Sequence, residues 1–383
     1  MRCNECALPE RFPKIQFDKK GTCNYCNDYH QTGAETSPLQ SIGHISEKLK
    51  TELLNCKSKE EFDALVSPSE GIDTSYFLHR VAREKGNILN FLREDLENTL
   101  EESKGKGEYD CLVALSGGKD STYLVHHLKE ERGLKVLACT VKPPVLSDVA
   151  LGNINITVKK LKVPHTTITP PEDLYIEMYR SLLTRKSHPD DYMHTVCYVC
   201  GPLMQDIALN TAVRFNIPLV ITGYAPAQPD HLFYEVPPTT LKKQNMPKEF
   251  DKAPFTDFFW DPSKFPDLRE LPRILAPYHV MDYNADEIME KVMKLGLVSK
   301  AGPLETNCDL AWLMVYLNVK NLGFFPLADE FSTAVRRGLM SRDRVVHEFN
   351  EIQRLVKENN FRKDKIDLML NKLDLKLEDL LAN

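Results

Sequence analysis

Hydrophobic residues follow two different periods along the chain. Between residues 43 and 104 they recur every three to four positions, which predicts helices. From residue 109 onward, short apolar runs alternate with longer amphipathic stretches. The runs predict strands at 109–115, 135–141, 165–169 and 218–222, and the stretches predict helices near 120–132, 148–162, 172–186 and 201–216. Strands separated by such helices form a parallel, doubly wound α/β sheet, whose ligands bind at the carboxyl ends of the strands.

Residues 225–275 break this pattern because they are rich in proline and aromatic residues, which argues against regular elements. They form either a lid or wall of a substrate pocket, or a loop packed by its own aromatic side chains. After Met281 the pattern turns helical again, with Ser341 at a helix start. Five segments follow: a cysteine-rich unit at 1–35, a helical linker region at 36–105, the α/β core at 106–225, an insertion at 226–280, and a helical C-terminal region at 281–383 that completes the site.

Composition narrows the class of protein. At 383 residues the chain is long enough for two or three domains. No stretch approaches the roughly 18 consecutive apolar residues of a membrane span, and the first residues lack the apolar centre of a secretion signal. We therefore expect a cytoplasmic protein without a membrane partner. The formal net charge of −6 disfavours a large nucleic-acid footprint, although scattered lysines and arginines leave room for a local basic patch.

Four of the ten cysteines lie near the start of the chain with the spacing of a metal site. Cys3-x-x-Cys6 is followed after sixteen residues by Cys23-x-x-Cys26, which is typical of a zinc ribbon. Four thiolates close a tetrahedral, saturated site, so the predicted role of this Zn²⁺ is structural. Because about thirty residues bury little apolar surface, the metal is predicted to hold this unit folded.

A glycine-containing loop follows the first predicted strand and precedes a helix. Its sequence is Ser116-Gly117-Gly118-Lys119-Asp120-Ser121-Thr122. The glycines let the backbone approach an anion, and the helix directs free N–H groups and its positive dipole end toward it. Lys119 adds a charge, and Asp120 is a candidate ligand for the Mg²⁺ that bridges phosphates. Thr140 and Gly223, at the ends of two further strands, complete the predicted ATP site.

This strand, loop and helix resemble the pyrophosphate loop of the PP-loop ATPases, also called N-type ATP pyrophosphatases. The Walker pattern, with four residues between its glycine and its Gly-Lys pair, is absent. The resemblance implies the adenine nucleotide alpha-hydrolase (HUP-like) fold. It also implies an enzyme that splits ATP between the α and β phosphates and adenylates a carbonyl oxygen of its substrate.

A second set of cysteines comprises Cys197, Cys200 and Cys308. By spacing alone, Cys197-x-x-Cys200 fits a redox pair, a zinc half-site or two core thiols. The pair precedes a predicted helix starting near Gly201, at the carboxyl edge of the sheet. In this pattern the chain resembles the tRNA 2-thiolation enzymes of the PP-loop superfamily. That resemblance implies that the three cysteines hold a [4Fe-4S] cluster with one open iron; inert buried thiols, or a persulfide on Cys200 or Cys308, are the alternatives.

Both ends of the chain resemble the N-acetyl sugar amidotransferases, which are also PP-loop enzymes. The similar positions are Arg2 to Cys6, Pro9, Pro13 to Asp18, Gly21 to Cys23, Cys26 to Tyr29, Phe324, Ser332, Val335-Arg336, Gly338 and Met340 to Arg342. Those enzymes lack the later Cys-x-x-Cys and often lack the loop lysine. Both differences concern the chemistry, and they favour sulfur over ammonia as the donated group.

Two functions follow from these patterns. The first is an ATP-dependent sulfurtransferase in which Lys119, Asp120, Cys197, Cys200 and Cys308 are the catalytic residues and ATP, Mg²⁺, Zn²⁺ and a [4Fe-4S] cluster are the cofactors. Its acceptor is a small molecule or a tRNA base, its sulfur donor is sulfide or a persulfide carrier, and the expected assembly is a homodimer. The second is an amidotransferase that takes ammonia from a separate glutaminase subunit. A regulatory nucleotide-binding module is a third, weaker interpretation, because the loop is intact.

Overall fold

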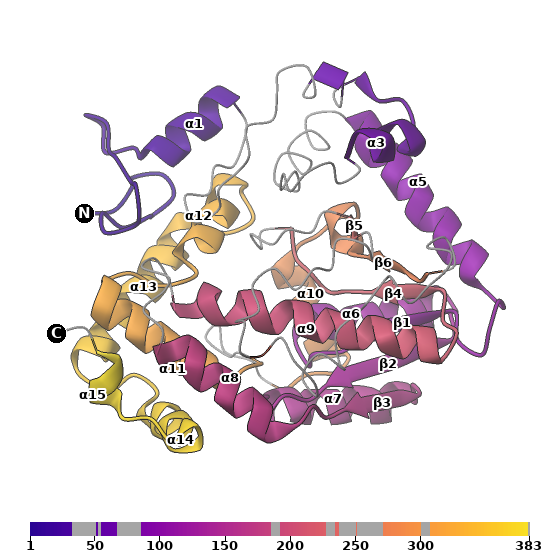
Figure 1. Ribbon diagram of the computed structural model, residues 1–383. Coiled ribbons are helices and arrows are strands. Elements are labelled where there is room, and N and C mark those ends of the chain that lie inside the picture. The colour runs from indigo at the N-terminus through magenta and orange to yellow at the C-terminus, as the bar shows by residue number, and fades with distance from the viewer. Residues whose placement is uncertain are drawn as a thin grey trace.

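The computed structural model describes residues 1–32, 51–52, 55–66, 86–184, 192–226, 234–236, 250, 271–299 and 307–381. A mainly parallel sheet lies at the centre of the described chain (Figure 1). Its strands are β1 (Cys111–Ala114), β2 (Val136–Val141), β3 (His165–Ile168), β4 (Leu219–Ile221), β5 (Glu235–Val236) and β6 (Arg273–Leu275). Their order is β3-β2-β1-β4-β6-β5, in which β5 alone pairs antiparallel. The predicted α/β class and its four strands are confirmed.

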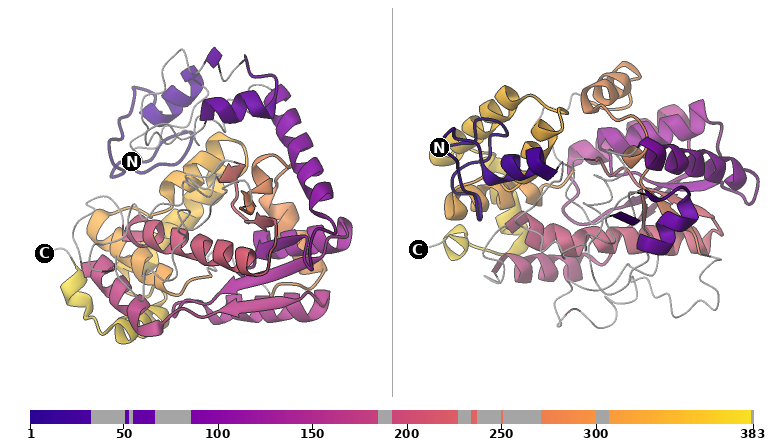
Figure 2. Two further views of the ribbon diagram at one scale, coloured as in Figure 1. Left: turned by 45° about the vertical axis from the view of Figure 1, so that its right-hand side comes forward. Right: turned by 90° about the horizontal axis from the view of Figure 1, so that it is seen from above.

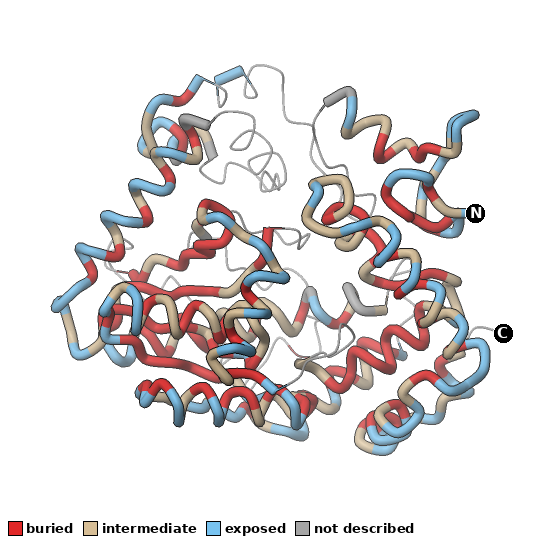
Figure 3. Tube along the Cα trace, turned by 180° about the vertical axis from the view of Figure 1, so that it is seen from behind, coloured by how far each residue is buried: buried red, intermediate tan, exposed pale blue. Residues whose placement is uncertain are grey.

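Helices cover both faces of this sheet because alternate strand residues face opposite ways. Cys111 and Val113 of β1 pack in one core with α5 (Gly86–Ser103), α6 (Lys119–His126), α7 (Asp148–Leu161) and α10 (Ala285–Lys294). Leu112, between them, packs on the other face against α9 (Tyr192–Arg214). Figure 3 shows these central strands as a largely buried layer. The sheet is therefore doubly wound, as predicted.

A second core lies beside the sheet and consists mainly of helices. It contains α8 (Glu172–Thr184), α11 (Leu310–Leu317), α12 (Ala328–Arg336), α13 (Arg342–Lys357), α14 (Lys363–Leu373) and α15 (Leu377–Leu380). Ser341 caps α13 by accepting a hydrogen bond from the Arg344 amide, which confirms the predicted helix start. The shorter elements are α1 (Asn24–Thr32), α3 (Lys59–Val66), η7 (Pro277–His279), and the π-helical turns η1 (His127–Glu131) and η8 (Asn318–Leu322).

The N-terminal unit packs against this helical core, so the two ends of the chain lie side by side (Figures 1 and 2). Phe12 meets the edge of Phe324 with ring centroids 5.4 Å apart. Arg342 of α13 donates to the carbonyl oxygen of Cys3 at 2.9 Å, and Arg2 donates to Gln353 at 2.9 Å. The unit is thus anchored by both apolar and polar contacts.

Two predictions about elements are wrong. The helix expected to begin near Gly201 begins at Tyr192, so Cys197 and Cys200 lie inside α9 rather than before it. The proline-rich stretch contributes β5 and β6 to the sheet, although no regular element was expected there. Most of residues 226–280, on which the lid prediction depends, lies outside the described residues. Within the described chain, no helix has the length and apolar character needed to cross a membrane.

Candidate active site and metal centre

The glycine loop lies at the point where the sheet order changes direction. From β1 the chain continues to β2 on one side, whereas β4 lies on the other side, so the crevice between β1 and β4 is the switch point at which doubly wound sheets bind ligands. The loop leaves β1 and enters α6 at Lys119. Gly223, just after β4, faces it so closely that a Cβ there would lie 3.0 Å from the Ser121 nitrogen. The predicted loop and Gly223 therefore meet across the switch point.

Position 117 requires glycine for two reasons, its backbone conformation and the lack of room for a side chain. Its φ of +82° lies in the left-handed region, which glycine adopts without strain. A Cβ at Gly117 would lie 2.4 Å from the carbonyl oxygen of Ala150 in α7. The side chain of Asn153 fixes the same contact by donating to the Gly117 carbonyl oxygen at 3.0 Å. The loop therefore packs directly on α7.

Serine and asparagine side chains hold the loop in shape. Ser121 Oγ accepts from the Ser116 amide at 3.2 Å, and the two hydroxyl oxygens are 3.1 Å apart. Asn307 Nδ2 donates to Ser116 Oγ at 3.2 Å. Ser116 is exposed, whereas Ser121 is buried. The sequence did not indicate Asn307, because it lies far along the chain and belongs to no motif.

Lys119 and Asp120 follow the two glycines at the start of α6 and pair with each other. Lys119 Nζ is 2.5 Å from Asp120 Oδ2, and both side chains are about one-fifth exposed, at 22% and 21%. Tyr283 joins them, since its hydroxyl is 3.1 Å from both Lys119 Nζ and Asp120 Oδ1. Tyr278 donates to the Asp120 carbonyl oxygen at 2.8 Å. Sequence reasoning missed both tyrosines.

The two threonines predicted for the ATP site are buried. Thr122 is fully buried, and its hydroxyl has no hydrogen-bond partner among the described residues. Thr140 Oγ1 donates to the Leu115 carbonyl oxygen at 2.8 Å and lies 2.9 Å from His165 Nε2. Thr140 thus ties the end of β2 to the strand that leads into the loop.

Cys200 and Cys308 both pack against the helical core, and the segment with Cys308 lies close to this loop. Cys308 is paired through an isolated β-bridge with Leu146, and the adjacent Asn307 touches Ser116 as described above. Tyr179 of α8 has its hydroxyl 3.2 Å from the Cys200 sulfur. Burial raises the pKa of Cys200 to about 11. Burial, and then the neighbouring Cys200 thiolate, raise the pKa of Cys308 to about 12.

Cys197 lies one helical turn before Cys200 and is exposed. Among the residues that the structure describes, the sulfurs of Cys197, Cys200 and Cys308 do not form a group whose ligand atoms all lie within 4.8 Å of one another. As placed, these three thiols therefore do not surround a single ion.

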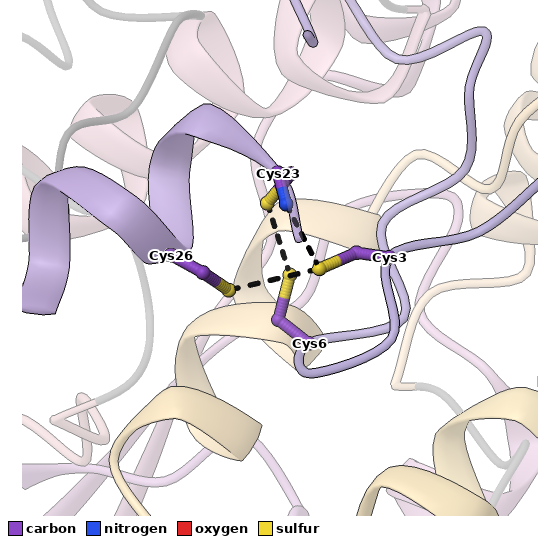
Figure 4. Close-up of side chains that lie close together, drawn as sticks. All are labelled: Cys3, Cys6, Cys23 and Cys26. Atoms are coloured by element: carbon purple, nitrogen blue, oxygen red, sulfur yellow. Dashed lines mark hydrogen bonds between the residues drawn. The ribbon is translucent and has the colours of Figure 1, made fainter. Parts of the chain in front are cut away.

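The four N-terminal cysteines form a compact sulfur site (Figure 4). The Cys3 and Cys26 sulfurs are 3.8 Å apart, the Cys6 and Cys23 sulfurs are 3.6 Å apart, and all four residues are buried. A tetrahedron with Zn–S bonds of about 2.3 Å has edges of about 3.8 Å, so these sulfurs fit a zinc ion. Contacts with the Cys23 and Cys3 sulfurs raise the pKa of the Cys26 thiol. Four thiolates therefore need a cation here.

No protein-family model matches the chain, and no curated protein matches it in sequence. Two solved structures are similar in backbone trace. One is the U34-tRNA thiolase NcsA from Methanococcus maripaludis with its [4Fe-4S] cluster, at 12% identity and a TM-score of 0.33, covering 76% of this chain and 83% of that one. The other is NMN synthetase from Francisella tularensis, at 13% identity and a TM-score of 0.33, covering 77% and 97%. At such low sequence identity and TM-score, neither similarity supports a conclusion about function.

Proposed function

We propose that this protein is an ATP-dependent sulfurtransferase that adenylates a carbonyl or amide oxygen of its acceptor and replaces that oxygen with sulfur. One observation carries the proposal: the segment with Cys308 lies against the glycine loop, through the bond from Asn307 to Ser116, and Cys200 and Cys308 pack against the same apolar core. Soft sulfur ligands and an anion-binding loop thus share one edge of the sheet. This is the arrangement that an activating and a sulfur-donating half-reaction need.

The glycine loop would carry out the activation. The acceptor oxygen attacks the α-phosphorus of ATP, and pyrophosphate leaves. Lys119 and the N–H groups at the start of α6 stabilise the negative charge that develops on pyrophosphate, and Asp120 would hold the Mg²⁺. Sulfur then attacks the activated carbon, and AMP departs with the original oxygen. The difficult loss of oxide is in this way replaced by the loss of AMP.

The raised thiol pKa values argue against free Cys200 and Cys308 as nucleophiles or persulfide carriers. With pKa values of about 11 and about 12, free Cys200 and Cys308 would be protonated at neutral pH and therefore weak nucleophiles. A bound metal deprotonates its cysteine ligands outright. When held by Cys197, Cys200 and Cys308, a [4Fe-4S] cluster would offer an open iron to external sulfide. Tyr179 would orient Cys200 through its hydroxyl.

The remaining parts of the proposal concern the structural metal, the class of acceptor, and the location and assembly of the protein. The four-cysteine site would bind Zn²⁺ as a structural ion, since its buried sulfurs leave no open position. The acidic net charge favours a small-molecule acceptor over a tRNA. We further propose a cytoplasmic homodimer that receives sulfur as sulfide or from a persulfide carrier; in the second case an external thiol would reduce the transferred sulfur and be oxidised to a disulfide.

Metal analysis and product analysis of anaerobically purified protein test the proposal. We expect zinc, iron and acid-labile sulfide, together with release of pyrophosphate and AMP from ATP when acceptor and sulfide are present. Cys200→Ser and Cys308→Ser should lose iron and sulfide but keep zinc. Cys56→Ser, which alters a buried thiol on another part of the chain, should keep both metals.

Two outcomes would contradict the proposal. One is wild-type protein that contains neither iron nor sulfide. The other is a Cys308→Ser variant that retains its iron. Protein without iron that consumes ammonia instead of sulfide would support the amidotransferase alternative, in which a glutaminase subunit supplies the ammonia.

A further inference from the structure

The hydroxyl of Tyr283 closes a ring of three polar groups at the glycine loop. Lys119 Nζ donates to this hydroxyl at 3.1 Å, and the hydroxyl donates to Asp120 Oδ1 at 3.1 Å. The ring is completed by Lys119 Nζ and Asp120 Oδ2, which are 2.5 Å apart. A phenol oxygen can accept and donate at once, so Tyr283 satisfies the ammonium and the carboxylate together.

Tyr283 is itself held in place. Its ring meets the edge of Tyr278 with centroids 5.0 Å apart, and Tyr278 is anchored on the Asp120 carbonyl oxygen at 2.8 Å. Lys119 Nζ lies 5.6 Å from the centre of the Tyr283 ring. A tyrosine hydroxyl keeps its proton at neutral pH, because its ordinary pKa is about 10. Tyr283 therefore donates a hydrogen bond to Asp120 and does not act as a base.

We propose that Tyr283 is a positioning residue that orients Asp120 for Mg²⁺ when ATP binds. The inference rests on the proposed use of ATP and names a residue that the loop motif does not contain. A triphosphate is a stronger anion than one carboxylate and draws Lys119 away from Asp120. Tyr283 then still bonds Oδ1, and Oδ2, released by Lys119, is free for the metal. Asp120 thus keeps its orientation after losing its partner cation.

The replacement Tyr283→Phe tests this role because it removes only the hydroxyl. The half-saturating Mg²⁺ concentration for binding of a non-hydrolysable ATP analogue should rise by about tenfold, the effect of losing one hydrogen bond to a charged group. The dissociation constant of ATP in EDTA should stay within about twofold or fall, since Lys119 loses one of its partners. Tyr123→Phe, on α6 but bonded to Lys291, should match the wild type in both measurements.

A double-mutant cycle separates positioning from general loss of structure. In an Asp120→Asn background, Tyr283→Phe should change the Mg²⁺ dependence no further, because the two residues act through one contact. An unchanged Mg²⁺ requirement in Tyr283→Phe would overturn the inference, and so would an equal loss of ATP affinity with and without Mg²⁺. Wild-type protein that binds no ATP would contradict the proposed function itself, before any variant is compared.

Discussion

Gly117 is held where one added methyl group would strike the backbone of another helix. Gly117→Ala would place a Cβ 2.4 Å from the Ala150 carbonyl oxygen at a φ of +82°. We expect it to destabilise the fold by at least about 2 kcal/mol, because the neighbour is backbone and the conformation itself is strained. We also expect ATP binding to be lost. Thermal unfolding and calorimetric titration with Mg–ATP measure the two effects.

Gly152→Ala is the matched control for this prediction. Gly152 lies on α7, two residues after Ala150, and a Cβ there would meet nothing within 4 Å. Alanine at this position should leave ATP binding unchanged and stabilise the protein by up to about 1 kcal/mol, the difference in helix propensity. If Gly117→Ala and Gly152→Ala had the same stability and the same affinity for ATP, the contact between the loop and α7 would contribute to neither property.

At the scale of elements, the start of α9 shows why local rules failed. The Tyr192 amide donates to Asn318 Oδ1 at 2.7 Å, so the first turn of α9 finds its hydrogen-bond acceptor on a residue 126 positions later in the chain. Sequence rules for helix caps consider only neighbouring residues, and they therefore predict too late a start for α9. The consequence is chemical, because Cys197 and Cys200 project from one helix, one turn apart.

The contact between β2 and β3 is expected to make the stability of the protein depend on pH. His165 of β3 contacts Thr140 of β2, and burial lowers the pKa of His165 below its ordinary value of 6.5. The unfolded chain therefore binds a proton more readily than the native protein. The free energy of unfolding should fall as the pH drops below about 6.5 and through the native pKa. Urea unfolding at pH 7.5 and pH 5 should show this loss, and His165→Gln should reduce it. An equal loss in both proteins would contradict the prediction.

At the scale of the molecule, the N-terminal unit and the C-terminal helices form one core, although their sequences lie at opposite ends of the chain. A buried ion pair in α12 lies close to the sulfur site. Arg336 and Asp329 are 3.7 Å apart with side chains only 3% exposed, and Ala328 of the same helix belongs to one apolar core with Cys6. The metal unit and the helical core should therefore lose structure together.

Removal of the proposed structural Zn²⁺ tests this coupling. Cys23→Ser should lose zinc and lower the melting temperature of the whole protein, because the N-terminal unit buries little apolar surface without the metal. Protection from hydrogen exchange should fall in α12 and α13 as well as in residues 1–32. Cys56→Ser should keep its zinc and the protection of these helices. Unchanged protection of α12 in zinc-free protein would show that the two parts are independent.

Much of the site followed from short-range patterns. The sequence alone indicated three features, because each depends on a run of neighbouring residues. They are the four strands, the glycine loop between β1 and α6, and the four-cysteine spacing. Asn307, Tyr278 and Tyr283 could not be found in this way. Each lies outside any motif and reaches the loop only because β6 and the segment before α11 fold back onto the switch point.

The sequence by itself determined the α/β class, the loop and the four-cysteine unit, because hydrophobic period and ligand spacing are local properties of the chain. Only the tertiary structure decided that the segment with Cys308 lies against the loop, that Tyr283 links Lys119 to Asp120, and that the two chain ends pack together. Those contacts join residues more than a hundred positions apart. Their partners are selected by the packing of whole elements, which no local pattern encodes.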